Sequence, residues 1–408
     1  MVVSAEGEFI NLSNMDFDVS DGQATLLEQV DKACKEIRPI EDRCYSEDQA
    51  NNQVIPILAR ARLLGLLVPK RYGDGQGVDP VTYALAAERI GQEGLGPAAF
   101  FSVHTALCQM TIVHWGTEEQ KARFLPPATR GESILAFGLT EPSAGSDPAS
   151  LTTSFEEKEG KFTLSGQKTW ISLGSTAKWV LIFAYPRGKR DGMCAFMVDT
   201  KSPGFKAERI KEKLGLRTSD TSTLYLDQVE VPREDMLGPL GKGLSVALSG
   251  LMEGRLGVAA GCVGVAHDCL NEALRCAGMR SENGRLVGEN LSIQRHIGLM
   301  STSLEAAKLL TLRAAFIKQR YLEHGEDKEQ REVVDLAITK AKYFASNASI
   351  DAADRGTQIL NAAGRSLPNR CARHFADARV SVIFEGANEI LEQKIALGSL
   401  GKKFEAYS

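Results

Sequence analysis

The sequence predicts an α+β protein in which a helical segment, a β segment and a second helical segment follow one another. Three observations carry this expectation. The chain has 408 residues, which is more than one compact core usually accommodates, so two or three domains are expected. Apolar residues follow a helical spacing at first, then form short runs rich in β-branched and aromatic residues, and then return to helical spacing. These changes place the domains at residues 1–132, 133–238 and 239–408.

The N-terminal segment should begin with a helix near residue 21. Ser20 followed by Gln23 matches a capping box, and an apolar stripe comes directly after it. Pro39 should end this helix, because proline has no amide hydrogen and clashes with the preceding turn. Further helices are expected over residues 81–90 and 98–112, with a glycine-rich connection between them.

The middle segment reads as a β domain. Its apolar runs are bounded by turn residues, as is typical of strands. The expected strands are residues 134–140, 161–172, 179–185, 193–199 and 222–231. In the last segment, long helices are expected over residues 244–279 and 333–364, and the charge run 328–332 is expected in a loop.

Composition excludes several classes of protein. The formal net charge of −4 and the pI near 6.0 do not indicate nucleic-acid binding. No run of about 18 uncharged apolar residues occurs, so no membrane span is expected. The first 22 residues contain acidic residues but no Lys or Arg, which fits neither a secretory signal nor a transit peptide, so a cytoplasmic location is expected.

Metal sites and the common nucleotide motifs are also not expected. The eight cysteines form no CxxC pair and the six histidines form no HxH or HxxxH pair, so neither a disulfide scaffold nor a metal site is predicted. The chain contains no GxGxxG between a strand and a helix, no P-loop and no GxSxG elbow. Rossmann dinucleotide sites, P-loop phosphate sites and hydrolase elbows are therefore not supported.

Two polar segments of the β domain could bind a phosphate or a polar heterocycle. In the first, a strand over residues 136–139 runs into a turn whose backbone N–H groups at residues 144–146 can converge, with the Thr140 and Ser146 hydroxyls nearby. In the second, residues 168–174 offer an aromatic plane and a hydroxyl at a strand end. Either segment alone could be an ordinary turn.

A third segment contains a candidate general base. Glu385 lies between Ile383-Phe384 and Gly386, where partial desolvation would raise the pKa of its carboxyl group. The alternative is a glutamate that merely sits at the positive end of a helix dipole.

Taken together, these segments resemble the acyl-CoA dehydrogenase family over about residues 21–401. The motifs that carry the resemblance are Gly116-Thr117-Glu118-Glu119-Gln120-Lys121, Phe124-Leu125-Pro126, Leu139-Thr140-Glu141-Pro142 through Asp147, Lys168-Thr169-Trp170-Ile171, Leu214-Gly215-Leu216-Arg217-Thr218-Ser219, Val229-Glu230-Val231-Pro232 and Ile383-Phe384-Glu385-Gly386. The resemblance implies an N-terminal helical domain, a central β domain and a C-terminal four-helix bundle. It also implies FAD bound between the last two and completed across a dimer interface.

The resemblance also implies roles for individual residues. The cofactor-binding positions that it implies are Phe137, Leu139, Thr140, Gly145, Ser146, Trp170, Ile171, Ser172, Arg280, Gln358, Ala387 and Glu389. Of these, Arg280 and Gln358 are expected to contact the FAD of a neighbouring subunit. The substrate-binding positions are Ser146, Glu253, Arg255, Phe384 and Gly386, and the catalytic residue is Glu385.

The implied reaction is an α,β-dehydrogenation of an acyl-CoA thioester to a trans-2-enoyl-CoA. Glu385 is expected to abstract the α-proton, while the β-hydrogen passes as hydride to flavin N5. The implied partners are the acyl-CoA or acyl-ACP substrate, an electron-transfer flavoprotein as electron acceptor, and further copies of this chain in a tetramer, or at least a dimer.

Departures from the family pattern leave alternatives open. Asn283 stands where the family often has Phe, Ala387 where Thr is usual, and Asn361-Ala362 where a Gly-Gly pair is usual. Other readings are an acyl-ACP dehydrogenase of secondary metabolism, a flavin oxidase or a monooxygenase on the same fold, or a non-catalytic partner protein. Glu385 argues against the monooxygenases, which generally lack this carboxylate.

Overall fold

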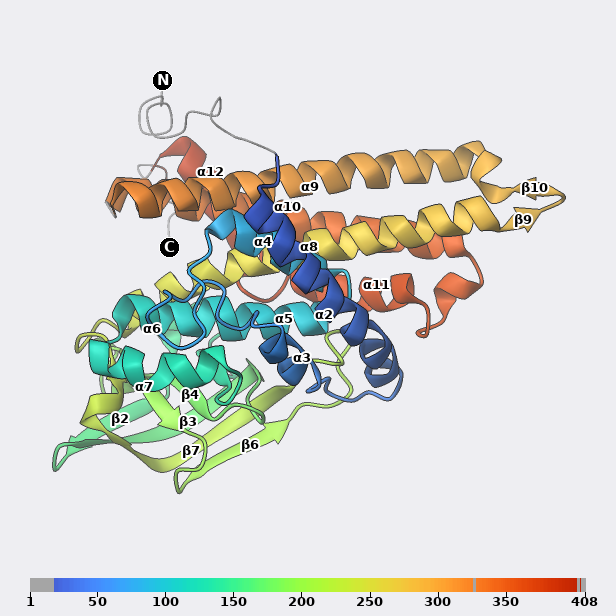
Figure 1. Ribbon diagram of the computed structural model, residues 1–408. Helices are drawn as coiled ribbons and strands as arrows, with labels where there is room; N and C mark the ends of the chain where they lie inside the picture. Colours follow the sequence, from blue (N-terminus) through green and yellow to red (C-terminus); the bar gives the residue numbers. More distant parts are fainter. Residues whose placement is uncertain (1–17, 326–327, 402–403, 405–408) are drawn as a thin grey trace.

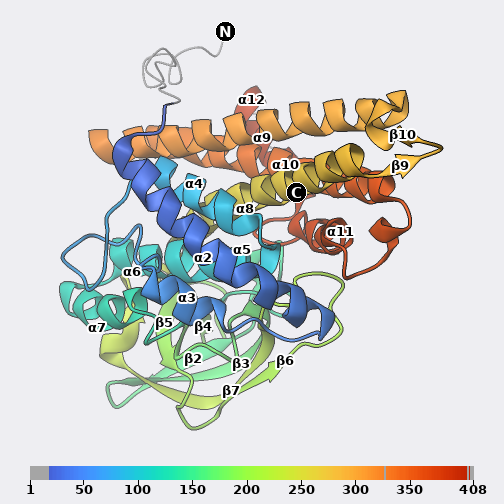
Figure 2. The same ribbon diagram turned by 45° about the vertical axis from the view of Figure 1, so that its right-hand side comes forward.

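The computed structural model describes residues 18–325, 328–401 and 404 in three layers (Figure 1). A bundle of long helices forms one side, the β-sheet forms the opposite side, and shorter N-terminal helices lie between them. A second view shows the same arrangement (Figure 2). The predicted fold class and the order of helical, β and helical segments are confirmed. The boundaries at residues 132 and 238 stay a prediction, and the first predicted domain begins in residues outside the described part.

The N-terminal part is helical throughout. Its elements are α2 (Asp21–Ser46), α3 (Val54–Arg60), α4 (Pro80–Gly91), α5 (Leu95–Phe101), the π-helix η2 (Ser102–Gln109), α6 (Met110–Trp115) and α7 (Glu118–Thr129). The predicted capping box is present, since the Ser20 hydroxyl accepts from the Gln23 amide and the Gln23 side chain accepts from the Ser20 amide.

The predicted helix end at Pro39 is wrong. Helix α2 continues through Pro39 to Ser46. Ile37 before the proline and Cys44 and Tyr45 after it are all buried. Packing on both sides of the proline therefore outweighs the one hydrogen bond that it removes from the helix.

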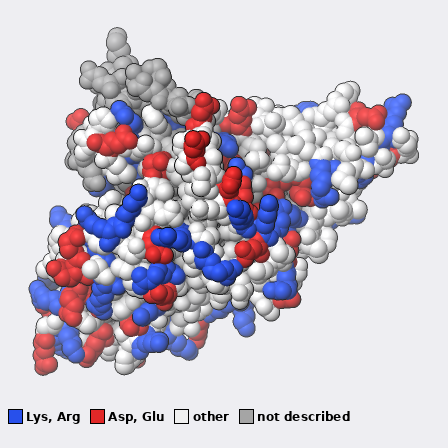
Figure 3. All heavy atoms as spheres, viewed as in Figure 1, with Lys and Arg blue, Asp and Glu red and all other residues white. Residues whose placement is uncertain are grey.

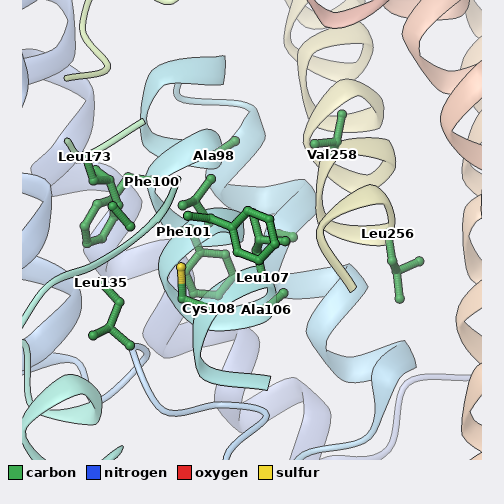
Figure 4. Packing of buried hydrophobic residues seen from close by; sticks show 14 of the residues in the cluster. Ala98, Phe100, Phe101, Ala106, Leu107, Cys108, Leu135, Leu173, Leu256 and Val258 are labelled. Atoms are coloured by element: carbon green, nitrogen blue, oxygen red, sulfur yellow. The ribbon is translucent and has the colours of Figure 1, made fainter. Parts of the chain in front are cut away.

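Helices α5 and α6 are joined without a break by the π-helix η2, which no apolar pattern predicted. Residues of α5 and η2 belong to the same buried core as residues of α8, and Figure 4 shows Phe101 of α5 and Leu107 of η2 on the side of Val258 of α8. Wide helical turns of this kind frequently occur at functional sites.

The β domain is one mixed sheet. Its elements are β1 (Leu135–Gly138), η3 (Pro148–Ser150), β2 (Ser154–Lys158), β3 (Lys161–Ser172), β4 (Trp179–Pro186), β5 (Cys194–Asp199), β6 (Phe205–Arg209), β7 (Thr221–Pro232), η4 (Arg233–Asp235) and β8 (Met236–Leu237). The strand order is β6-β7-β3-β2-β4-β5-β8, and β1 pairs parallel to β4. The five predicted strands are present. Strands β2, β6 and β8 were not predicted, because they are short and carry few apolar residues or, for β8, span only two residues.

The C-terminal part is the predicted helical bundle. Its elements are α8 (Gly243–Met279), β9 (Ser281–Glu282), β10 (Arg285–Leu286), η5 (Val287–Glu289), α9 (Leu291–His324), α10 (Lys328–Leu360), η6 (Ala363–Arg365), α11 (Arg370–Ser381) and α12 (Asn388–Leu400). Helix α10 packs against α8 and α9, and α11 and α12 pack against α10. The charge run 328–332, expected in a loop, instead forms the start of α10.

Helix α8 is long and largely apolar. By length and composition it could cross a membrane, although it contains charged residues and therefore no long uncharged run. In its most apolar window, however, 89% of the residues are buried inside the protein. A helix buried in a bundle and a helix that spans a membrane are both apolar on all sides, because neither faces water. This composition is therefore weak evidence for a membrane span.

Candidate functional site

One face of α8 brings the candidate site residues together. Gly250, Gly254 and Gly257 lie on this face at helical spacing. A Cβ atom added at Gly250 would lie 3.1 Å from the Phe137 ring, and one added at Gly254 would lie 2.7 Å from Glu385 Oε1. The absence of side chains at these positions therefore lets strand β1 and the α11–α12 loop approach the same helix.

The next glycine on this face meets the N-terminal helices. A Cβ atom at Gly257 would lie 2.4 Å from Ser102 Oγ of η2 and 2.7 Å from Tyr83 Oη of α4. Ser102 Oγ also donates a hydrogen bond of 3.1 Å to the Gly254 carbonyl. Gly257 therefore allows close helix packing, and Gly254 leaves space for the Glu385 side chain beside α8.

Glu385 lies in the loop between α11 and α12, in a backbone conformation that is rare for a side-chain-bearing residue. Its φ is +54°, and Gly386 follows with a φ of +99°. Two cations hold this loop by its backbone: Arg255 Nε donates to the Glu385 carbonyl at 2.9 Å, and Lys342 Nζ donates to the Gly386 carbonyl at 2.8 Å. Such strain persists only where the surroundings impose it, and it concentrates at functional sites.

The Glu385 carboxylate is left without a neutralising partner. Its Oε2 atom is buried and has no hydrogen-bond partner in the described structure, although the residue as a whole is half-buried. Burial raises the pKa of Glu385 to about 7, and the charges of Arg255 and Lys342 offset only part of this effect. The desolvation that the sequence suggested is therefore present, and it suits a base that works near neutral pH.

The two polar segments of the β domain lie side by side. The Thr169 amide donates to the Thr140 carbonyl at 2.9 Å, and the fully buried Lys168 Nζ donates to Glu141 Oε1 at 2.8 Å. Glu141 also accepts from the Thr152 amide and hydroxyl and from the Thr153 amide. Burial alone would raise the pKa of Glu141, but Lys168 and these donors lower it to about 2.

This ion pair was missed as a functional feature by the sequence reasoning. A signal was present, because Lys168 lies in phase with the inward-facing Phe162 and Leu164 of β3. A charged residue on the buried face of a strand requires a partner. Glu141, in the turn that follows β1, is that partner.

Trp170 presents an aromatic plane to solvent at an irregular point of β3. The strand shifts register between Lys168 and Ile171, Trp170 has a φ of +58°, and 59% of its surface is exposed. In the same strand, Ser172 is half-buried and the Ile171 side chain is buried. Gly145 and Ser146 are exposed, and a Cβ atom at Gly145 would meet nothing within 4 Å. An exposed ring, hydroxyls and unobstructed backbone fit the ring and phosphates of a flavin.

Other predicted residues occupy more enclosed positions. Phe137 is buried with its ring 4.9 Å from that of Phe183, Leu139 is also buried, and Thr140 is half-buried. Glu253 forms a buried ion pair with Lys318 of α9 and lies 3.5 Å from His114 Nε2. The Glu253 carboxylate is therefore already paired within the protein. A contact between Glu253 and the substrate stays a prediction.

Arg280 and Gln358 lie at the end of the bundle beside the β9–β10 hairpin. Arg280 Nη1 donates to the Ile359 carbonyl of α10 at 3.2 Å, and its Nη2 forms an ion pair with Glu282. Gln358 lines a cavity of about 360 Å³. Of the other predicted positions, Ala387 is the N-cap residue of α12. Glu389 is exposed in the first turn of α12, where its negative charge interacts favourably with the helix dipole.

The cysteines and the possible metal ligands form no further site within the described part of the chain. The eight cysteines are free, and only Cys276 is not buried. Among the described residues no cluster of three or more His, Cys, Asp or Glu side chains could hold a metal ion.

Comparison with known proteins assigns the family. The chain matches the models of the acyl-CoA dehydrogenase N-terminal domain over residues 20–132, the middle domain over residues 136–229 and the C-terminal domain over residues 241–400. It is 36% identical over 373 residues to an acyl-CoA dehydrogenase of Bacillus subtilis, covering 91% of this chain and 96% of that protein.

Solved structures give the same result. A chain in a structure of the electron transferring flavoprotein of Acidaminococcus fermentans matches with a TM-score of 0.89 at 30% identity, covering 95% of this chain and 100% of that one. A glutaryl-CoA dehydrogenase of Mycobacterium smegmatis in complex with FADH2 matches with a TM-score of 0.88 at 28% identity, covering 98% and 99%. The chain belongs to the acyl-CoA dehydrogenase family, whose members are FAD-dependent oxidoreductases.

Proposed function

We propose that this enzyme converts a saturated acyl-CoA thioester to the trans-2-enoyl-CoA, with Glu385 as the general base. The observation that carries the proposal is the Glu385 carboxylate, which is desolvated and has no ion-pair partner among the residues that the structure describes. Arg255 and Lys342 hold the backbone of its loop. FAD, when bound against residues of the β domain, supplies the hydride-accepting chemistry at flavin N5.

Glu385 is suited to hold the α-proton of the thioester at its carboxylate. A desolvated carboxylate with a pKa near 7 is a stronger base than a free glutamate and is still largely ionised above neutral pH. Its own backbone N–H donates to no carbonyl of the described backbone. That N–H is therefore available to stabilise negative charge on the thioester oxygen while Glu385 removes the proton.

The finer residue roles belong to this proposal. Trp170, Thr140, Ser172 and the 144–146 turn would hold the flavin, with Phe137 and Leu139 packed behind them. Arg255 and the backbone at Phe384 and Gly386 would position the thioester beside Glu385. The match to a chain in an electron transferring flavoprotein structure supports an electron-transfer flavoprotein as the electron acceptor.

The active unit is proposed to contain at least two copies of this chain, as in a tetramer. In Figure 3 charged atoms gather over the β domain and the N-terminal helices, while the side of the bundle toward the hairpin is largely uncharged. Large apolar side chains are exposed there, including Leu291 at 80% and Met279 at 74%. Exposed apolar patches rimmed by polar residues mark interfaces between proteins.

An anaerobic absorbance titration tests the function. The FAD-loaded protein would be titrated with short, medium and branched acyl-CoA thioesters while the oxidised flavin band is followed. We expect one class to bleach the band and thereby identify the substrate. Bleaching by acyl-carrier-protein thioesters alone would move the substrate to that class. A band that no thioester changes, with FAD bound, would refute the proposed dehydrogenation.

A further inference from the structure

The motif at residues 214–219 lies in the loop that joins β6 to β7, outside the site described above. In Figure 2 this light green segment rises from the sheet toward α11. Loops usually run over the surface, but residues 218–220 are buried. A Cβ atom added at Gly215 would collide with the Ala376 carbonyl of α11. The helices therefore fix the path of this loop.

Asp377 ties the loop to α11, the helix that leads into the Glu385 loop. The Leu216 amide donates to Asp377 Oδ1 at 2.7 Å, and the Tyr45 hydroxyl of α2 donates to the same oxygen at 3.3 Å. Asp377 is buried, and α11 ends one turn further on at Ser381. Hydrogen bonds to a charged acceptor are strong, so the position of the loop follows the position of α11.

Asp220 ties the other end of the loop to the turn that follows strand β3. Its Oδ2 atom accepts from the Ser175 amide at 3.0 Å and from the Thr176 hydroxyl at 2.9 Å, and its Oδ1 atom accepts from the Ser175 hydroxyl at 2.8 Å. The Leu173 amide donates to the Asp220 carbonyl at 2.7 Å, and Leu173 has a φ of +65°. A left-handed backbone persists only where its surroundings impose it, so Asp220 fixes the conformation of this turn.

We propose that the loop at residues 210–220 sets the position of the flavin-binding end of β3 relative to Glu385, with Asp377 and Asp220 as positioning residues. The proton and the hydride leave neighbouring carbons of one substrate, so the base and the flavin must both be held to within about 0.5 Å. Through Asp377 the loop follows α11, and through Asp220 it holds the turn next to Trp170. The inference rests on the proposed function, since it takes Glu385 as the base and β3 as part of the flavin site.

Four variants and two matched controls test the proposal. Asp377→Ala removes the acceptor of the loop amide, and Asp220→Ala removes the acceptors of the turn. Asp377→Asn and Asp220→Asn each keep an oxygen that can accept the backbone amide. The controls remove one buried hydrogen bond to each carboxylate and leave these contacts in place. They are Tyr45→Phe for Asp377 and Ser222→Ala for Asp220, whose Oδ1 atom accepts from the Ser222 hydroxyl at 3.2 Å.

Three properties are measured below the thermal midpoint of every variant: the FAD dissociation constant, the visible spectrum of the bound flavin, and the limiting rate of flavin reduction by acyl-CoA in FAD-saturated enzyme. Asp377→Ala should lose at least about 10-fold in limiting rate, because the base shifts, while its FAD affinity stays near the wild-type value. Asp220→Ala should raise the FAD dissociation constant about 10-fold and change the flavin spectrum. The asparagine variants should recover most of each loss, and both controls should match the wild type.

Two results would each overturn the proposal. One is flavin reduction by Asp377→Ala at the rate of Tyr45→Phe, and the other is an FAD affinity and a flavin spectrum of Asp220→Ala equal to those of Ser222→Ala. Lower thermal midpoints without these changes would show that the two carboxylates only stabilise the fold. A wild-type enzyme that binds FAD but is not reduced by any thioester would instead refute the proposed function. The FAD affinity and spectrum of Asp220→Ala would still decide whether the loop holds the flavin site.

Discussion

At the residue scale, the pKa of Glu385 predicts how the reaction depends on pH. The carboxylate must be ionised to accept a proton, and burial raises its pKa to about 7. Flavin reduction measured as kcat/KM should therefore rise with pH, reach half its plateau near pH 7 and be about tenfold slower at pH 6 than at the plateau. Stopped-flow reduction between pH 5.5 and 8.5 checks this. A flat profile across that range would show that Glu385 is not the titrating base.

A second residue-scale prediction concerns Gly254. In Gly254→Ala the added Cβ would lie 2.7 Å from Glu385 Oε1, so the flexible carboxylate would have to move. Because misplacement by about 1 Å can cost about 100-fold in rate, we expect a loss of that order in kcat with FAD binding and thermal stability retained. Gly298→Ala, whose Cβ would meet nothing within 4 Å, is the matched control. Activity equal to that of the control would place the carboxylate elsewhere.

At the element scale, the Glu141–Lys168 ion pair fastens the first polar turn to strand β3. Lys168→Met would leave the Glu141 carboxylate buried with only its hydroxyl and amide donors, and breaking a buried pair costs about 3–5 kcal/mol. The thermal midpoint should fall by several degrees, and FAD should bind more weakly. Lys161 is on the same strand as Lys168 and forms an exposed ion pair with Glu230 of β7. Lys161→Met should therefore change neither the thermal midpoint nor FAD binding. Equal midpoints for the two variants would contradict this role.

Local signals predicted most of the elements, and tertiary contacts account for the differences. Strand β3 has the predicted bounds, and the Ser20 capping box is formed, because both follow from neighbouring residues. Pro39 misled the sequence reasoning, since long-range packing keeps α2 helical beyond it. In the site, the Glu385 environment was predicted from adjacent residues. The left-handed backbone of Glu385 and the π-helix η2 depend on distant contacts and could not be predicted.

At the scale of the whole molecule, the uncharged side of the bundle predicts self-association. Leu291 and Met279 are among its most exposed apolar residues. Sedimentation should give a mass at least twice the 44.3 kDa of one chain, and a tetramer is expected. Leu291→Glu should weaken the assembly and, with it, FAD retention, because a buried charge at an interface is costly. A monomeric wild-type enzyme that retains FAD would contradict the proposed cross-subunit cofactor site.

The most direct test of the central claim is the rate of flavin reduction in Glu385→Gln. This variant keeps the size of the side chain and removes its basicity, so FAD content and thermal stability should match the wild type. With an acyl-CoA that bleaches wild-type flavin under anaerobic conditions, we expect the reduction rate to fall by at least about 100-fold. A rate within a few-fold of the wild-type value would show that another group removes the α-proton.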